Sequence, residues 1–272
     1  MDTPMSATGL PPANGLKPAG LAFQCHGDRR QPALMLLHGF LSSSAQWLPN
    51  IAHLAQDYHV VTVELWGHGD SPEPSDKQHY SIAGYINGFE LIRQQLQIPH
   101  WGLVGQSYGA GLVLNYAARC PQQCSSVLVT NSRSAFGKIA PPRAADASAP
   151  PKPPRELPFH PIHARRFPEH IKAALVASAD RMTASCIADS GDLAHQLAFS
   201  HRLHELTQPL LLANGKFEKS FQTDLQQLLA LYPQLDVVNL DGGHSVNIEA
   251  AEAFNQAAKA FFDQHQRAAQ PE

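Results

Sequence analysis

The sequence has few cysteines, few charged side chains and no long apolar run. Its four cysteines, Cys25, Cys120, Cys124 and Cys186, are too scattered for a disulfide framework, so we expect reduced thiols in a cytoplasmic protein. Only 16% of the 272 residues are charged, and the formal net charge of −3 offers no positive footprint for nucleic acid. A membrane-spanning helix would need about 18 consecutive apolar residues, and no such run occurs.

The first 20 residues also lack the basic start and apolar stretch of a secretory signal. We interpret the Pro- and Gly-rich residues 1–20 as a flexible leader. The chain is 43% apolar and long enough to bury one sizeable core.

Strand-like and helix-like segments alternate along the rest of the chain. Six short apolar runs, each stopped by glycine or a polar residue, are typical of strands buried on both faces of a sheet. Apolar side chains recur at helical spacing over residues 81–96 and 247–262. This alternation predicts an α/β fold with a mostly parallel central sheet and helices on both faces. The predicted strands occupy residues 33–37, 59–65, 100–105, 125–130, 209–213 and 236–240.

The alternation stops between the fourth and fifth predicted strands, where we place a helical cap over residues 133–206. The core is then expected over residues 21–132 and 207–265. Seven prolines in residues 137–158 predict an extended tether at the start of the cap. Ligands bind at the carboxyl ends of strands in such sheets, so an insertion at this point is expected to cover a pocket.

Beyond the tether, helix-like stretches are predicted over residues 168–188 and 191–205. Apolar cap side chains can line the predicted pocket or attach the cap to the sheet. The candidates are Phe159, Ile162, Phe167, Ile171, Leu175 and Phe199.

The segment Gly105-Gln106-Ser107-Tyr108-Gly109 lies between a predicted strand and a helix that starts near Ala110. This is the context that the G-x-S-x-G turn requires, because a tight turn needs small residues two positions from the serine. It predicts Ser107 as a nucleophile with an exposed hydroxyl, and it offers the Tyr108 N–H group to an anion. The segment His38-Gly39-Phe40, after the first long strand, can present a second N–H group from Phe40. Two such donors make an oxyanion hole.

A serine hydroxyl needs a general base to act as a nucleophile. Among 15 histidines, His244 is favoured because it follows the last predicted strand and opens the final helix. Glu218 is the only carboxylate in the turn that follows the fifth strand, where a third triad member is expected. Asp241, three residues before His244, is the alternative acid.

Five segments together resemble the α/β-hydrolase superfamily over about residues 21–263: LLHGF (36–40), ELWGHGDS (64–71), GQSYG (105–109), NGKFE (214–218) and DGGH (241–244). The chain looks most similar to the esterase, C–C hydrolase and menaquinone-pathway lyase group with a small helical cap. Many members of the family have Asp where this chain has Glu218 and Glu64. We expect Glu64 and His68 to hold their loop rather than take part in chemistry.

The resemblance implies hydrolysis of a carboxylic ester or related acyl substrate through an acyl-enzyme. We expect no metal or organic cofactor, a small-molecule acyl substrate, and neither nucleic acid nor membrane as a partner. C–C bond hydrolysis or an elimination by the same triad is an alternative, in which cap arginines bind a substrate carboxylate. A small-molecule receptor is a third possibility, because a fold does not fix a function. The candidate arginines are Arg133, Arg165, Arg166 and Arg181.

Overall fold

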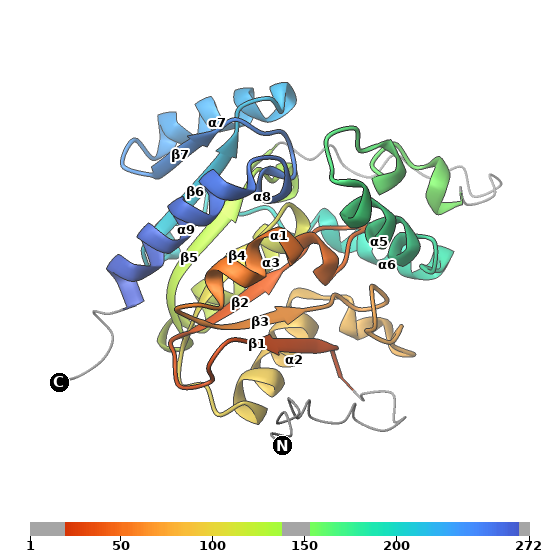
Figure 1. Ribbon diagram of the computed structural model, residues 1–272, viewed down its shortest axis with the longest axis horizontal. Coiled ribbons are helices and arrows are strands. Elements are labelled where there is room, and N and C mark those ends of the chain that lie inside the picture. The colour runs from red at the N-terminus through yellow and green to blue at the C-terminus, as the bar shows by residue number, and fades with distance from the viewer. Residues whose placement is uncertain (1–19, 138–152, 267–272) are drawn as a thin grey trace, which may run out of the picture.

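A seven-stranded sheet forms the centre of the protein, seen in a computed structural model that describes residues 20–137 and 153–266 (Figure 1). The strand order is β1-β3-β2-β4-β5-β6-β7, and β1 alone runs antiparallel to its neighbour. The strands are β1 (Phe23–His26), β2 (Ala33–Leu37), β3 (His59–Val63), β4 (Trp101–Gly105), β5 (Cys124–Thr130), β6 (Leu210–Gly215) and β7 (Asp236–Leu240).

The six strands predicted from apolar runs correspond to β2 through β7, and the predicted α/β class is confirmed. Strand β1 was not predicted. It lies at the sheet edge, pairs only with β3 and has no fully buried residue. The segment of β1 therefore lacks the continuous apolar run that identified the other strands.

Side chains of successive strand residues point to opposite faces of the sheet. Leu34 and Leu36 of β2 pack with the helices of one face, whereas Met35 and Leu37 pack with those of the other. Helices α1 (Leu48–Leu54) and α9 (Ala251–Gln266) cover the first face. The second face is covered by α2 (Ile82–Gln95), α3 (Tyr108–Arg119) and α7 (Lys219–Leu231).

The predicted helix over residues 247–262 is interrupted. Ala250 has a non-helical backbone (φ −131°, ψ 47°), so α8 (Val246–Glu249) is separate from α9. The predicted helix over residues 81–96 corresponds to α2, and the Ser81 hydroxyl caps it by accepting from Gly84 N–H.

The region between β5 and β6 carries α4 (Arg133–Phe136), α5 (Glu169–Ala179) and α6 (Ala184–Ala194), with no strand in its described part. The helix-like stretch predicted over residues 168–188 contains α5 and the start of α6, because Thr183 accepts from Cys186 N–H and starts a second helix there. The helix predicted over residues 191–205 ends at Ala194, and beyond it only a 3-10 turn forms (Leu203–Glu205).

In Figure 1, α5 and α6 lie beyond the ends of the strands. Residues 138–152 of the predicted tether 137–158 lie outside the described residues, as do residues 1–19 of the predicted leader. The division into core and cap stays a prediction. Short 3-10 turns complete the described part at Ser44–Trp47, Lys77–His79, Pro121–Gln123, Pro154–Glu156 and Pro161–His163.

Within residues 20–137 and 153–266, every helix is too short or too polar to span a bilayer. The expected cytoplasmic location stays a prediction.

Candidate active site

Ser107 occupies a strained turn between β4 and α3. Its backbone has φ 53° and ψ −112°, in the region of positive φ that a residue with a Cβ atom rarely adopts. The flanking glycines are sterically required. A Cβ atom on Gly109 would lie 2.5 Å from the Leu37 carbonyl oxygen, and one on Gly105 would lie 2.7 Å from the Ala110 Cα. The small flanking residues predicted from the sequence are therefore those that this packing needs.

Ser107, His244 and Glu218 lie in one hydrogen-bonded series. The His244 Nε2 atom is 2.9 Å from Ser107 Oγ, and the His244 Nδ1 atom is 2.9 Å from Glu218 Oε1. With the imidazole proton on Nδ1, His244 donates to the Glu218 carboxylate, and its Nε2 is free to accept from the serine hydroxyl. The structure thus brings together the three residues singled out in the sequence.

Glu218 is held by a second polar side chain. Asn131, directly after β5, donates from Nδ2 to Glu218 Oε2 at 2.9 Å, and its Oδ1 accepts from Gly215 N–H at 3.0 Å. The alternative acid, Asp241, points elsewhere and forms an exposed ion pair with Lys216 at 2.6 Å. The longer Glu218 side chain therefore does reach His244.

The loop after β2 lies beside Ser107, since a Cβ atom on Gly39 would be 3.3 Å from the Ser107 Cβ. Several side chains hold the backbone of this loop. The Gly39 carbonyl oxygen is 2.8 Å from His38 Nδ1, and Leu41 N–H donates to His68 Nε2 at 3.3 Å. In residues 20–137 and 153–266, the N–H groups of Phe40 and Tyr108 donate to no protein acceptor.

Glu64 and His68 hold this loop through hydrogen bonds to its backbone. Glu64 accepts from the Ser44 N–H and hydroxyl groups, and its Oε2 lies 2.9 Å from His38 Nε2. Burial alone would raise the pKa of Glu64, but the contacts with His38 and Ser44 outweigh it and lower the pKa. Burial, with a smaller electrostatic influence of the neighbouring His38, lowers the pKa of His68 to about 3. His68 is therefore neutral, so its Nε2 can accept from Leu41 while Nδ1 donates to the Trp66 carbonyl at 2.9 Å.

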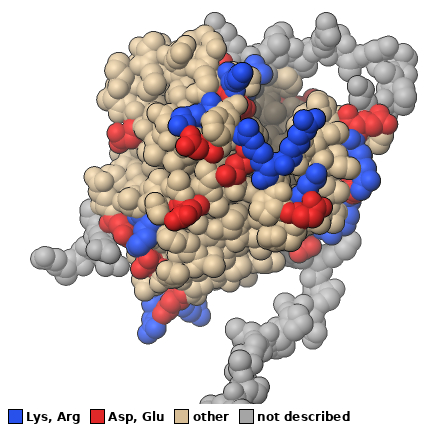
Figure 2. Space-filling view, turned by 45° about the horizontal axis from the view of Figure 1, so that its top comes forward, with Lys and Arg blue, Asp and Glu red and all other residues tan. Residues whose placement is uncertain are grey.

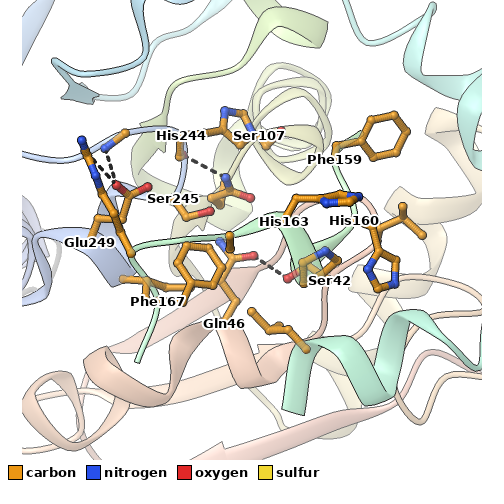
Figure 3. Close-up of a pocket in the computed structure, with 18 of the residues that line it drawn as sticks. Ser42, Gln46, Ser107, Phe159, His160, His163, Phe167, His244, Ser245 and Glu249 are labelled. Atoms are coloured by element: carbon orange, nitrogen blue, oxygen red, sulfur yellow. Dashed lines mark hydrogen bonds and ion pairs between the residues drawn. The ribbon is translucent and has the colours of Figure 1, made fainter. Parts of the chain in front are cut away.

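Ser107 and His244 open into a cavity of about 630 Å³ (Figure 3). Its wall combines the loop after β2, the loop of His244 and residues 158–167. The apolar side chains of its wall include Phe40, Leu41, Phe159, Phe167, Leu175 and Ile248. A mainly apolar cavity with a few polar groups is the usual form of a small-molecule site.

Three of the six apolar cap candidates line this cavity, namely Phe159, Phe167 and Leu175. Phe199 is instead fully buried in the main core, whereas Ile162 is 37% exposed. The remaining candidate, Ile171, is buried against Leu175 and α8.

Two of the four candidate arginines, Arg165 and Arg166, line the cavity. Arg166 lies 3.4 Å from Glu249, and its guanidinium stacks over the Phe217 ring. The other two arginines form ion pairs elsewhere, Arg133 with Asp224 and Arg181 with Asp70. Figure 2 shows Lys and Arg side chains beside a hollow, with acidic side chains interspersed on the same face.

Sequence reasoning missed several polar residues around the site. Asn131 donates to Glu218, and Gln106 donates to the His244 carbonyl. Gln46 accepts from Gly39 N–H. A polar residue directly after a buried strand was the available signal for Asn131. For Gln46 no local pattern exists, because its partners are set by tertiary packing.

Comparison with known proteins connects this geometry to one fold. A family model described as the alpha/beta hydrolase fold matches residues 32–157. The enol-lactonase from Burkholderia xenovorans LB400 superposes with a TM-score of 0.72 at 21% identity, covering 89% of this chain and 96% of that one. The bromoperoxidase from Bacillus anthracis gives a TM-score of 0.72 at 18% identity, over 89% and 95% of the two chains.

Sequence relatives match over shorter stretches. An uncharacterized protein of Mycobacterium tuberculosis is 33% identical over 131 residues, which is 45% of this chain and 38% of the relative. Carboxylesterase YbfK of Bacillus subtilis is 29% identical over 40% of this chain and 37% of its own length. The chain thus spans less than two fifths of the length of these curated relatives.

Proposed function

We propose that this chain, which has the α/β-hydrolase fold, is a serine hydrolase that cleaves a carboxylic ester or a related acyl substrate. The observation that carries this proposal is the hydrogen-bonded series from Ser107 through His244 to Glu218 at the wall of an apolar cavity. The substrate, in this proposal, is a small acyl compound that binds in that cavity.

In the proposed reaction, Ser107 Oγ attacks the carbonyl carbon while its proton passes to His244 Nε2. The imidazolium that forms is stabilised by the Glu218 carboxylate at Nδ1. The proton then moves from Nε2 to the leaving alkoxide, which departs as an alcohol and leaves an acyl-serine. Water attacks the acyl-serine with His244 again as the base, and the carboxylic acid is released.

The N–H groups of Phe40 and Tyr108 are the proposed oxyanion hole. Phe40 belongs to the loop after β2 and Tyr108 is the first residue of α3, and no protein acceptor among the described residues occupies either N–H group. Two donors that are fixed before substrate arrives cost no reorganisation when the carbonyl oxygen becomes negative.

Labelling with a fluorophosphonate probe and turnover of p-nitrophenyl esters test the proposal together. We expect rapid labelling and turnover in the wild type, and loss of both in Ser107→Ala without a change in melting temperature. Ser245 lines the same cavity, so Ser245→Ala is the matched control and should keep the label. Ester hydrolysis that persists in Ser107→Ala would remove the proposal.

The same assay separates the alternatives. A C–C hydrolase would cleave a β-diketone substrate faster than esters of similar size, with the same dependence on Ser107. A receptor would label at Ser107 but turn over none of these compounds.

A further inference from the structure

A chain of buried amide side chains joins the loop after β2 to the loop that carries His244. The Gln46 Nε2 group donates to Asn247 Oδ1 at 3.2 Å, and Asn247 donates from Nδ2 to the Gln46 carbonyl at 3.0 Å. Asn50 donates to the Asn247 carbonyl at 2.9 Å and to Asn255 Oδ1 at 2.8 Å. Gln46, Asn50 and Asn247 are each at most 2% exposed, so water does not compete for these bonds.

At one end of this series of amide side chains, the Gln46 carboxamide contacts the loop after β2. Its Oε1 accepts from the Ser42 hydroxyl at 2.7 Å, drawn as a dashed line in Figure 3, and from Gly39 N–H at 3.3 Å. The cavity with Ser107 is also bordered by Gln46 and Ser42. One oxygen of Gln46 therefore satisfies two donors of the loop that carries Phe40.

Gly39 is a flexible position in the backbone of this loop. Glycine has wide backbone freedom, and a Cβ atom at this position would overlap the Gln106 Oε1 atom. Two contacts fix the peptide groups on either side of it: Gln46 holds Gly39 N–H, and His38 holds the Gly39 carbonyl. The C=O of Gly39 and the N–H of Phe40 belong to one planar trans peptide and point in opposite directions. Fixing both sides of Gly39 therefore fixes the direction of Phe40 N–H.

We propose that Gln46 is a positioning residue for the oxyanion hole, and that Asn247 holds the Gln46 carboxamide in the orientation that this role requires. Gln46 touches no reacting atom in this proposal. It acts through Gly39 by keeping Phe40 N–H directed at the developing oxyanion. The inference rests on the proposed function, since it concerns the same site.

Amide hydrogen bonds also reach the loop of His244, the proposed general base. Asn247 lies three residues after His244, and Gln106, the neighbour of Ser107, donates to the His244 carbonyl at 3.1 Å. The loops of the oxyanion hole, the nucleophile and the base are therefore joined by amide hydrogen bonds. A change at Gln46 should alter the transition state more than it alters the binding of the substrate.

Gln46→Met tests this, because it keeps the length of the side chain and removes both polar atoms. We expect kcat for a p-nitrophenyl ester to fall about tenfold, below the hundredfold or greater loss typical of deleting an oxyanion donor itself. KM should stay within about threefold, which marks an interaction made in the transition state. The inhibition constant of an aryl boronic acid, which forms a tetrahedral adduct on Ser107, should rise by the same factor as kcat falls.

Asn255→Ala is the matched control. Asn255 belongs to the same series of amides, and within the described residues its side chain hydrogen-bonds to Asn50 and the Pro49 carbonyl but not to Gln46 or Gly39. Both variants should lower the melting temperature, yet Asn255→Ala should leave kcat and the boronate constant unchanged. If Gln46→Met does not fold, Gln46→Asn shortens the side chain by about 1.5 Å and should weaken boronate binding in the same direction.

Two results would overturn the inference: boronate affinity unchanged in the Gln46 variants, or an equal loss in Asn255→Ala, which would mean a purely structural role. Failure of the proposed function looks different, because the wild type itself would neither react with fluorophosphonate nor bind the boronate at Ser107.

Discussion

Asn131 Nδ2 lies 2.9 Å from Glu218 Oε2, while the other carboxylate oxygen of Glu218 lies 2.9 Å from His244 Nδ1. Asn131 follows β5, Glu218 immediately precedes α7, and 87 positions separate them in the chain. The amide thus fixes one oxygen of the carboxylate, so that the other is directed at the imidazole. Asn131 therefore supports the series of Ser107, His244 and Glu218 without adding a charge to it.

Asn131→Ala should reduce kcat about tenfold, because loss of one hydrogen bond to a carboxylate corresponds to about 1.4 kcal/mol in the barrier. The effect should act through Glu218. In a Glu218→Gln background the same change should cost little more, which a double-mutant cycle on ester turnover would measure. Full additivity of the two losses would show that Asn131 acts independently of the acid.

Glu218→Gln should slow ester turnover strongly, by about a thousandfold, because the imidazolium of His244 loses its charged partner. Asp241→Asn removes only an exposed pair with Lys216 and should change kcat by less than about twofold. Steady-state kinetics of the two purified variants compare them directly. A larger loss in Asp241→Asn would reverse the assignment of the acid.

Phe167→Ala should alter the preference among p-nitrophenyl esters of increasing chain length. Phe167 lines the cavity with Ser107, so its removal enlarges the space for an acyl chain. We expect kcat/KM for long-chain esters to change by about tenfold relative to the acetate ester, a difference of about 1.4 kcal/mol. Ile162→Ala is the control, since Ile162 belongs to the same segment but does not line the cavity. An equal loss for all esters in Phe167→Ala would mean that this residue only supports the fold.

The free energy of unfolding should decrease as the pH falls below about 6.5. His68 has a pKa of about 3 in the folded protein, so only the unfolded chain takes up its proton between pH 6.5 and 3. One such proton contributes a slope of about 1.4 kcal/mol per pH unit. Burial also lowers the pKa of His26, His59 and His160, which adds to the slope in the same direction.

Urea unfolding of His68→Gln at pH 7 and pH 5 isolates the contribution of His68. Glutamine can still accept and donate hydrogen bonds but does not titrate, so the loss of stability between the two pH values should shrink by about 2 kcal/mol. Exposed His201 provides the control, and His201→Gln should keep the wild-type slope. An unchanged slope in His68→Gln would show that His68 is protonated equally in both states.

The sequence predicted the parts of the fold that depend on short-range patterns. Continuous apolar runs identified β2 through β6, because strands buried on both faces need apolar side chains at most positions. The edge strand β7 is only partly buried and was identified by the shorter run around Val237 and Val238. Helix boundaries were less predictable. The break at Ala250 and the new start at Thr183 depend on single backbone angles and one capping bond, which the spacing of apolar residues does not report.

By itself, the sequence determined the turn around Ser107, because its strained backbone requires glycine at nearby positions in the chain. Only the tertiary structure shows that Glu218 rather than Asp241 lies within hydrogen-bond distance of His244, and that Asn131 contacts Glu218. The register of β5 against β6 pairs Thr130 with Ala213 and places Asn131 beside the turn of Glu218. The register of β6 against β7 likewise brings that turn to the loop of His244. Steric rules act over a few residues and are readable in a sequence, whereas hydrogen bonds between distant segments exist only once strand pairing has set their distances.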